Sequence, residues 1–296
     1  MPRFKPWGGL PKDAPESVKK KRWSSLYKYF LHYATSQDGI HWDLPNLGLR
    51  NSYPVNKNGE IPYVEGEEEM LVKWLEDKDN NIVLSLNEKD GSGRQLTTAA
   101  GLAGGFCVID ANETPHPAAR GRYTAFYGSG GFCLAYSDDG FRWNAYAENP
   151  IRQGQSSDTY NVLMYDPRRE EYIIFCRPRW SRGGPDPRAV TRIASKDLIH
   201  WGPERVILQT DDRDAPAHGR RSLGGAEGES LYTRGRELQF YGFTPKVYQD
   251  MYIGFALVYD TYSMTSWYEL VHSYDGLKWK REPRREPFIA PTPGQW

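Results

Sequence analysis

A seven-residue phrase, Ser-x-Asp-Gly-x-x-Trp, occurs three times in this 296-residue chain and a fourth time with one change. The unchanged copies are Ser36–Trp42, Ser137–Trp143 and Ser273–Trp279. In the copy Ser195–Trp201, Leu198 takes the place of the glycine. An internal repeat of this kind indicates that one structural unit recurs along the chain.

The phrase predicts a tight turn between two β-strands. Asp-Gly is a strong hairpin signal, because glycine adopts positive φ without a Cβ clash and the Asp carboxylate accepts hydrogen bonds from nearby backbone amides. The tryptophan begins the next strand and can cover the hairpin with its ring. Each copy follows a strand-like run, such as Gly131–Tyr136 or Trp267–His272. Because it lacks the glycine, the copy with Leu198 is expected to form a different type of turn.

The spacing of the copies predicts a β-propeller. A propeller blade takes roughly 40 to 50 residues, so the first gap between copies holds either one weak further copy or a long insertion, and the third gap carries additional loop. We therefore expect an all-β fold, a five-bladed β-propeller with four-stranded antiparallel blades. Neither end of the chain supplies a complete further blade, so the last blade is incomplete unless the N-terminal segment completes the ring. An open β-sandwich with chance Asp-Gly turns is the alternative.

The charge balance and the cysteines exclude several classes of function. The chain has 38 Lys and Arg residues against 38 Asp and Glu, so no global field favours nucleic acid or a membrane as partner. Cys107, Cys133 and Cys176 are odd in number and lie in apolar runs, which predicts small buried hydrophobic residues and no disulfide framework. No zinc-type spacing occurs, so we expect neither a metal nor a cofactor.

The chain is expected to have a short leader and a single domain. Residues 1–22 are rich in Pro and Lys and are predicted to be a solvated leader, with a phosphate-binding patch as the alternative. Residues 23–296 are predicted to form one propeller domain. The first residues lack an apolar stretch typical of an export signal, so a cytoplasmic location is expected unless a further N-terminal segment carries one. The oligomeric state is left open.

Four phrases, the first of which includes a copy of the repeat, carry a family resemblance: Tyr33–Trp42, Asn80–Leu84, Asn161–Pro167 and Phe240–Gly242. They resemble bacterial proteins related to glycoside hydrolase families 32 and 43, which are five-bladed β-propellers acting on furanosides and related glycans. The resemblance covers most of the chain and implies a glycosidase whose partner is a carbohydrate. Because the shared phrases are mainly blade scaffolding, they are more specific for the fold than for the activity.

Cleavage of a glycosidic bond in such a channel needs carboxylates. One protonates the leaving oxygen, and a second attacks the anomeric carbon or activates water. Asp158 is the first candidate, because it opens the predicted inner strand that contains Asn161–Pro167. Glu227, in Ala-Glu-Gly-Glu, resembles the Glu-Gly-Pro segment that carries the general acid in family 43. Asp79 is the candidate base or nucleophile of an earlier blade.

Candidate substrate-binding residues accompany these acids. They are two reserve carboxylates, two arginines of a loop that runs from 177 to 188, and one aromatic residue of the resemblance: Asp110, Glu237, Arg177, Arg179 and Tyr241. The Asn-Asp-Pro-Asn and Arg-Asp-Pro phrases of family 32 are absent, and Asp166 is expected to lie in a strand-end turn. The aspartates of the repeated phrase are expected to be structural, because one active site needs such a residue only once.

Two other functions stay open. The chain could be a non-catalytic carbohydrate-binding or scaffold propeller, or a glycan phosphorylase whose loop Arg177–Arg188 holds phosphate. Two carboxylates facing each other across the channel favour the hydrolase. One carboxylate with a basic pocket favours the phosphorylase, and neither arrangement favours the binding protein.

Overall fold

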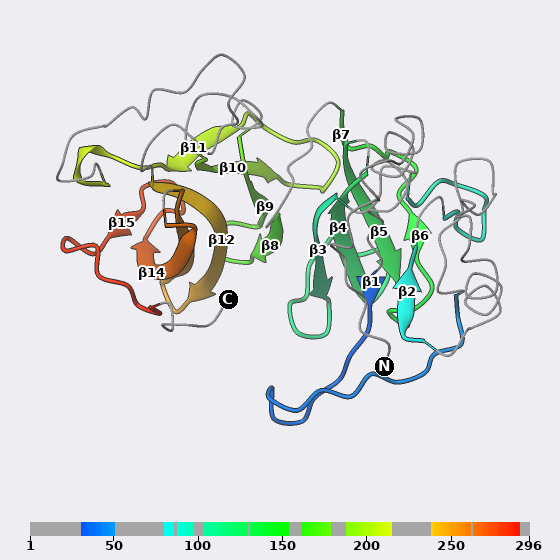
Figure 1. The fold of residues 1–296 in the computed structure, drawn as a ribbon. Coiled ribbons are helices and arrows are strands. Elements are labelled where there is room, and N and C mark those ends of the chain that lie inside the picture. Colours follow the sequence, from blue (N-terminus) through cyan, green and yellow to red (C-terminus); the bar gives the residue numbers. More distant parts are fainter. Residues whose placement is uncertain are drawn as a thin grey trace, which may run out of the picture. The chain divides into compact units, whose positions relative to one another are not determined.

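The computed structural model describes residues 31–50, 80–85, 88–97, 103–129, 131–153, 161–178, 188–214, 238–261 and 263–290. The chain divides into two compact units, Met1–Glu88 and Lys89–Trp296. Within the described ranges every regular element is a β-strand except one 3-10 turn, η2 (Asp212–Asp214), which confirms the predicted all-β class (Figure 1). The described part contains no helix of the length and apolarity that a membrane span requires. The predicted leader lies outside it, and the single domain 23–296 stays a prediction.

The first unit contains a two-stranded antiparallel sheet. β1 (Leu31–His32) pairs with β2 (Ile82–Leu84), so a strand that precedes the first turn copy meets a segment far downstream in the sequence. The Asn81 side chain stabilises this strand pair with two hydrogen bonds. Its NH2 group donates to the Tyr33 carbonyl at 2.5 Å, and its oxygen lies 2.8 Å from a ring nitrogen of His32.

The second unit contains three antiparallel sheets, and in each of them consecutive strands pair in chain order (Figure 1). Sheet I comprises β3 (Ala103–Asp110), β4 (Tyr123–Gly128), β5 (Gly131–Ser137) and β6 (Asn144–Ala145), with β7 (Arg152–Gln153) also paired to β5. Sheet II comprises β8 (Val162–Asp166), β9 (Glu171–Cys176), β10 (Val190–Ser195) and β11 (Arg205–Leu208). Sheet III comprises β12 (Leu238–Tyr248), β13 (Met251–Asp260), β14 (Thr265–Ser273) and β15 (Lys280–Arg281).

The first strands of the three sheets are neighbours. β3 contacts β8, and β8 contacts β12. Apolar clusters join the sheets, with Phe126 and Ile174 in the cluster between sheets I and II, and Phe175 and Phe240 in the cluster between sheets II and III. Four-stranded meanders whose first strands lie side by side have the order of consecutive propeller blades.

The repeated phrase forms the predicted turn. In the second copy the Ser137 hydroxyl donates to a carboxylate oxygen of Asp139 at 3.1 Å and accepts from the Gly140 amide at 2.9 Å. The same Asp139 oxygen accepts from the amides of Phe141 at 2.8 Å and Arg142 at 2.7 Å. Burial alone would raise the pKa of Asp139, but these hydrogen bonds lower it to about 2. The ionised aspartate therefore organises the turn backbone.

The glycine of the phrase is required by its backbone conformation. Gly39, Gly140 and Gly276 have φ values of 75°, 79° and 69°, in the left-handed region that glycine adopts without strain. A Cβ on Gly276 would also lie 3.2 Å from the ring of Tyr252, and one on Gly140 would lie 3.5 Å from the ring of Tyr123. The turns of sheets I and III are thus each packed on a tyrosine of the second strand.

The expectation that Leu198 changes the turn type is wrong. Leu198 has a φ of 69° and adopts the same conformation as the glycines. Asp197 accepts hydrogen bonds from the amides of Ile199 at 2.9 Å and His200 at 2.8 Å, and the indole nitrogen of Trp201 donates to the Leu198 carbonyl at 2.7 Å. The Leu198 side chain is fully buried in the cluster between sheets I and II. Its burial offsets the strained φ.

The cysteines are free, as predicted. Cys133 and Cys176 are buried and Cys107 is half-buried. Burial raises the pKa of Cys133 to about 11 and that of Cys176 to about 12. Both thiols therefore stay protonated at neutral pH and act as small apolar side chains.

Candidate functional site

Each sheet of the second unit has two chemically different ends. In an antiparallel four-stranded meander, the connections between strands 1 and 2 and between strands 3 and 4 lie at one end. We call this the turn end, because the repeated phrase lies there. The start of strand 1 and the connection between strands 2 and 3 lie at the opposite end, which we call the loop end.

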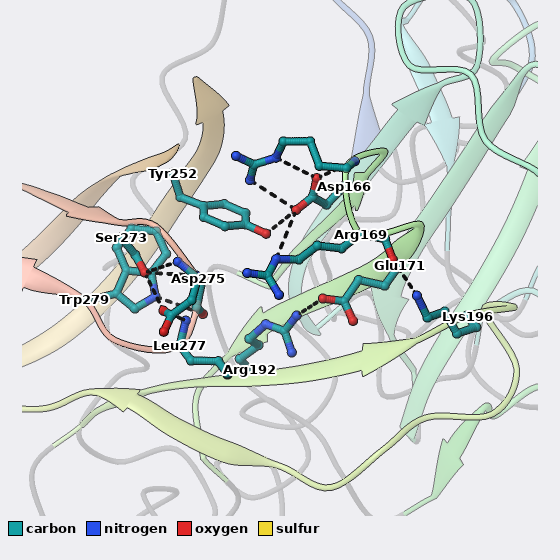
Figure 2. A network of polar contacts seen from close by, with 12 residues as sticks. Asp166, Arg169, Glu171, Arg192, Lys196, Tyr252, Ser273, Asp275, Leu277 and Trp279 are labelled. Carbon is teal, nitrogen blue, oxygen red and sulfur yellow. Dashed lines mark hydrogen bonds and ion pairs between the residues drawn. The ribbon is translucent and has the colours of Figure 1, made fainter. Parts of the chain in front are cut away.

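Side-chain contacts align the turn ends of neighbouring sheets. His116, in the connection after β3, places a ring nitrogen 2.9 Å from the hydroxyl of Tyr172 near the start of β9. In the same way the hydroxyl of Tyr252, near the start of β13, donates to Asp166 at the end of β8 (Figure 2). Arg168 donates to the same carboxylate at 3.0 Å. The turn ends of the three sheets therefore lie on one side of the unit, and the loop ends lie on the other.

Two of the predicted substrate-binding residues meet at the loop end. Arg177 directly follows β9, and Tyr241 lies in the first part of β12. A terminal guanidinium nitrogen of Arg177 donates to the Tyr241 carbonyl at 3.1 Å, and the Arg177 Cζ lies 4.5 Å from the centre of the Tyr241 ring. The side chains come from different sheets, so the contact joins sheets II and III.

A β-bulge places Tyr241. The register of β12 against β13 shifts between Phe240 and Gly242, which leaves Tyr241 as the extra residue. Phe240 and Phe243 on either side are buried, whereas Tyr241 is only half-buried. Bulges redirect a side chain and are common next to functional sites. The Phe-Tyr-Gly phrase of the family resemblance thus lies at this bulge.

Further residues complete the site. The Arg188 guanidinium lies over the same Tyr241 ring, with Cζ 5.1 Å from its centre, and hydrogen-bonds the side-chain oxygen of Gln239. Tyr259, the cross-strand neighbour of Gln239, meets the Tyr241 ring edge to face at 5.4 Å. From the sequence, Arg188 was expected only as the last residue of the arginine-rich loop, and Gln239 and Tyr259 were not predicted. Pairing in the sheet brings these two together, and no motif marks them.

A cavity of about 270 Å³ opens beside this cluster. One lining residue lies just before β10 of sheet II, and the other four come from three strands and one connection of sheet III: Arg188, Tyr241, Tyr259, Met264 and Ser266. The wall thus combines a guanidinium group, two aromatic rings, a thioether and a hydroxyl. Cavities lined by apolar and aromatic groups with a few convergent polar groups are typical of small-molecule sites.

Asp110 lies at the other end of its sheet. It is the last residue of β3, at the turn end, where Arg122 binds its carboxylate with nitrogen–oxygen distances of 2.8 and 3.2 Å. The hydrogen bond from Arg122 lowers the pKa of Asp110. The structure therefore does not bring Asp110 together with Arg177 and Tyr241. Its role in glycan binding stays a prediction, as does the role of those two residues.

The remaining predicted residues lie outside the described ranges: Asp79, Asp158, Glu227, Arg179 and Glu237. Their roles stay predictions. In the sequence Glu237 directly precedes β12, and Asp158 shortly precedes β8. Within the described ranges, no cluster of three or more His, Cys, Asp or Glu side chains could hold a metal ion.

Comparison with known proteins gives structural similarity alone. No protein-family model matches the chain, and a search of curated proteins finds no match. An N-acetylgalactosamine deacetylase from F. plautii, solved with blood group B trisaccharide, is 16% identical over 88% of this chain and 62% of its own, with a TM-score of 0.45.

Two glycoside-active enzymes show similarity of the same order. An endo-arabinase from Bacteroides thetaiotaomicron VPI-5482 is 14% identical over 73% of this chain and 71% of its own, with a TM-score of 0.42. A thermostable family-43 glycoside hydrolase is 14% identical over 66% of this chain and 54% of its own, with a TM-score of 0.37. This chain therefore spans less than two thirds of the deacetylase and of the family-43 enzyme.

Proposed function

We propose that this protein is a glycoside hydrolase that acts on a furanoside or related glycan by carboxylate acid/base catalysis. In this proposal the three described sheets are blades of a five-bladed ring, and the glycan binds at their loop ends. In this proposal Glu227 supplies the general acid, Asp79 is the base or nucleophile, and Asp158 is the remaining carboxylate of the site.

The contact of Arg177 with Tyr241 is the observation that carries the proposal. Both residues were expected to bind substrate, and they meet at the loop end beside a cavity of about 270 Å³. Aromatic rings and fixed hydrogen-bond donors are the groups that orient a sugar. The same end receives the starts of β8 and β12, to which Asp158 and Glu237 are attached in the sequence. This order along the chain supports the proposal that the candidate acids act beside the binding groups.

The test is hydrolysis of a panel of furanoside and pyranoside glycans, including arabinan, fructan, xylan and galactan. The parent protein is compared with Asp158→Asn, Glu227→Gln and Asp79→Asn, after circular dichroism has shown that each variant is folded. Loss of a general acid or base should lower the rate by roughly 10²- to 10⁴-fold. Asp250→Asn is the matched control, because Asp250 is an exposed carboxylate in the turn after β12. This control should keep the parent rate.

The alternatives give different products. Sugar release that requires inorganic phosphate and yields a sugar phosphate would replace the hydrolase with a phosphorylase. Saturable glycan binding without any product would indicate a carbohydrate-binding protein. If all three acid variants hydrolyse glycan at the parent rate, the assignment of the acids is wrong.

A further inference from the structure

We propose that the cavity beside Arg188 binds an acidic sugar through its carboxylate, as in a hexuronic acid unit of a glycan. This names the substrate class of the site described above and so rests on the proposed function. The inference is carried by the hydrogen-bonding state of Arg188, by the position of its charge and by the size of the cavity.

The contacts of Arg188 with the described residues use only some of its N–H donors. A guanidinium group carries five N–H donors in a planar fork. One of them is used by the side-chain oxygen of Gln239, and the cation lies over the Tyr241 ring. Among the residues that the structure describes, neither Asp nor Glu forms an ion pair with Arg188. Its charge is therefore held in place by neutral groups, which leaves donors directed to a ligand.

Other arginines of the same unit are neutralised by carboxylates. Arg120 pairs with Glu148 at 2.9 Å, Arg122 with Asp110 at 2.8 Å and Arg168 with Asp166 at 3.0 Å. Arg281 pairs with both Asp214 and Glu269, and all three of those side chains are buried. In each of these pairs, a carboxylate of the protein balances the positive charge of the arginine. Arg188 differs because it lines a cavity and its fixed neighbours, Gln239 and Tyr241, are neutral.

The cavity fits one monosaccharide better than an extended chain. Its volume of about 270 Å³ lies near the small end of ligand sites, which begin at roughly 300 Å³. Tyr241, Tyr259 and Met264 supply apolar surface for a sugar ring, and the Ser266 hydroxyl can bond a sugar hydroxyl. A smaller cavity of about 10 Å³ next to Arg177 has room for no more than a water molecule.

The geometry favours a carboxylate over a phosphate. One edge of the Arg188 fork remains after the Gln239 contact, and a planar carboxylate matches a guanidinium edge with two parallel hydrogen bonds. Among the described residues that line the cavity, Arg188 is the one cation, and it balances one negative charge and only part of a phosphate dianion. Because Tyr241 holds the guanidinium by its ring, the donor is oriented before the ligand arrives.

The experiment follows the Arg side-chain Nε–H signals by NMR while simple ligands are added to the full chain. The ligands are D-galacturonate, D-glucuronate, their neutral amides galacturonamide and glucuronamide, and inorganic phosphate. Comparison with Arg188→Gln assigns the Arg188 signal. We expect saturable shifts with at least one uronate, and affinity at least about tenfold weaker for its amide, which is the scale of a hydrogen bond to a charged group.

The variants provide the matched comparison. Arg188→Gln should weaken uronate binding about tenfold or more, whereas Arg205→Gln, on an exposed residue of β11, should leave it unchanged. Equal affinity for acid and amide would overturn the acidic-sugar inference, as would tighter binding of phosphate or no saturable shift with either uronate. The acid-against-amide comparison uses the parent protein, so it decides the matter even if Arg188→Gln does not fold.

Binding is measured without any turnover. Uronate binding in a protein whose Asp158, Glu227 and Asp79 variants retain full hydrolysis would contradict the assigned catalytic acids and support the subsite. Hydrolysis of neutral glycans that depends on these carboxylates, without uronate binding, would support the assigned catalytic acids and contradict the acidic-sugar subsite. The two proposals can therefore fail separately.

Discussion

At the scale of single residues, the fourth turn copy shows how packing overrides a local preference. A left-handed backbone costs a non-glycine residue about 1 to 2 kcal/mol. Leu198 adopts it with a φ of 69° because its side chain is fully buried among residues of sheets I and II. The burial of one leucine contributes about 1.5 to 3 kcal/mol, enough to offset that cost. The turn is therefore kept by tertiary contacts in this copy and by glycine in the others.

This balance predicts an order of stabilities. Leu198→Ala keeps the strained φ and loses the packing, so it should lower the free energy of unfolding by about 2 to 5 kcal/mol. Leu198→Gly loses the same packing but relieves the strain, so it should be about 1 kcal/mol more stable than Leu198→Ala and still less stable than the parent. Urea denaturation measures both differences. A Leu198→Gly protein as stable as the parent would show that burial does not hold this turn.

At the scale of elements, a buried carboxylate links two sheets. Asp166 is fully buried at the end of β8, where it accepts hydrogen bonds from Arg168 and from the hydroxyl of Tyr252 in β13 (Figure 2). The Arg168 guanidinium also lies 4.5 Å from the centre of the Tyr252 ring. Burial alone would raise the pKa of Asp166, but the bonds from Arg168 and Tyr252 bring it below its ordinary value. The connection after β8 is thus a structural turn, as the sequence predicted.

Tyr252→Phe should destabilise the protein in a pH-dependent way. The loss of one hydrogen bond to a buried charge costs about 1.5 to 3 kcal/mol. Since the folded-state pKa of Asp166 is lowered, its stabilising contribution is complete above the unfolded pKa of about 3.9 and is lost as the pH falls through the folded pKa. The deficit of Tyr252→Phe should therefore be largest near neutral pH and shrink below about pH 4.

Urea denaturation at pH 7 and below pH 4 tests this expectation. Tyr248→Phe is the control, because Tyr248 is 53% exposed at the end of β12, and it should change stability by less than about 0.5 kcal/mol. A deficit that is constant with pH would mean that the Tyr252 hydroxyl does not act through the ionised form of Asp166.

At the scale of the second unit as a whole, the turn end and the loop end differ in the contacts that their side chains make. The turn end holds the repeated phrase and the links of Asp166 to Tyr252 and of His116 to Tyr172, which are contacts between groups of the protein itself. The loop end holds the cavity that Arg188 lines. Changes at the two ends should therefore have separable effects on stability and on binding.

Arg168→Gln and Tyr241→Ala test that separation. Arg168→Gln leaves Asp166 with fewer donors, so it should lower stability by about 1 to 3 kcal/mol and leave the affinity for D-galacturonate within about twofold. Tyr241→Ala removes the ring under the Arg188 guanidinium and should weaken that affinity about tenfold or more. Titration calorimetry and urea denaturation of both proteins provide the comparison. Equal losses of affinity would contradict the division into two ends.

The candidate site was predictable only in part. Arg177 and Tyr241 were found because the arginine-rich loop and the Phe-Tyr-Gly phrase are visible in the sequence, and the structure brings these two residues together. Asp110 was chosen by its place at the end of a strand, and the sequence does not tell which end of a blade faces a ligand. Gln239 and Tyr259 carry no local signal, because only the pairing of β12 with β13 makes them neighbours.

The sequence by itself determined the strands and the turns of this protein. The hydrogen bonds of the Ser-x-Asp-Gly-x-x-Trp turn lie within seven consecutive residues, so the information for the turn is contained in the phrase. The tertiary structure alone decided that Leu198 can replace glycine, that Tyr241 lies in a bulge and that Arg188 faces a cavity. Each of these depends on atoms of other sheets or strands, and such contacts exist only once the chain has packed.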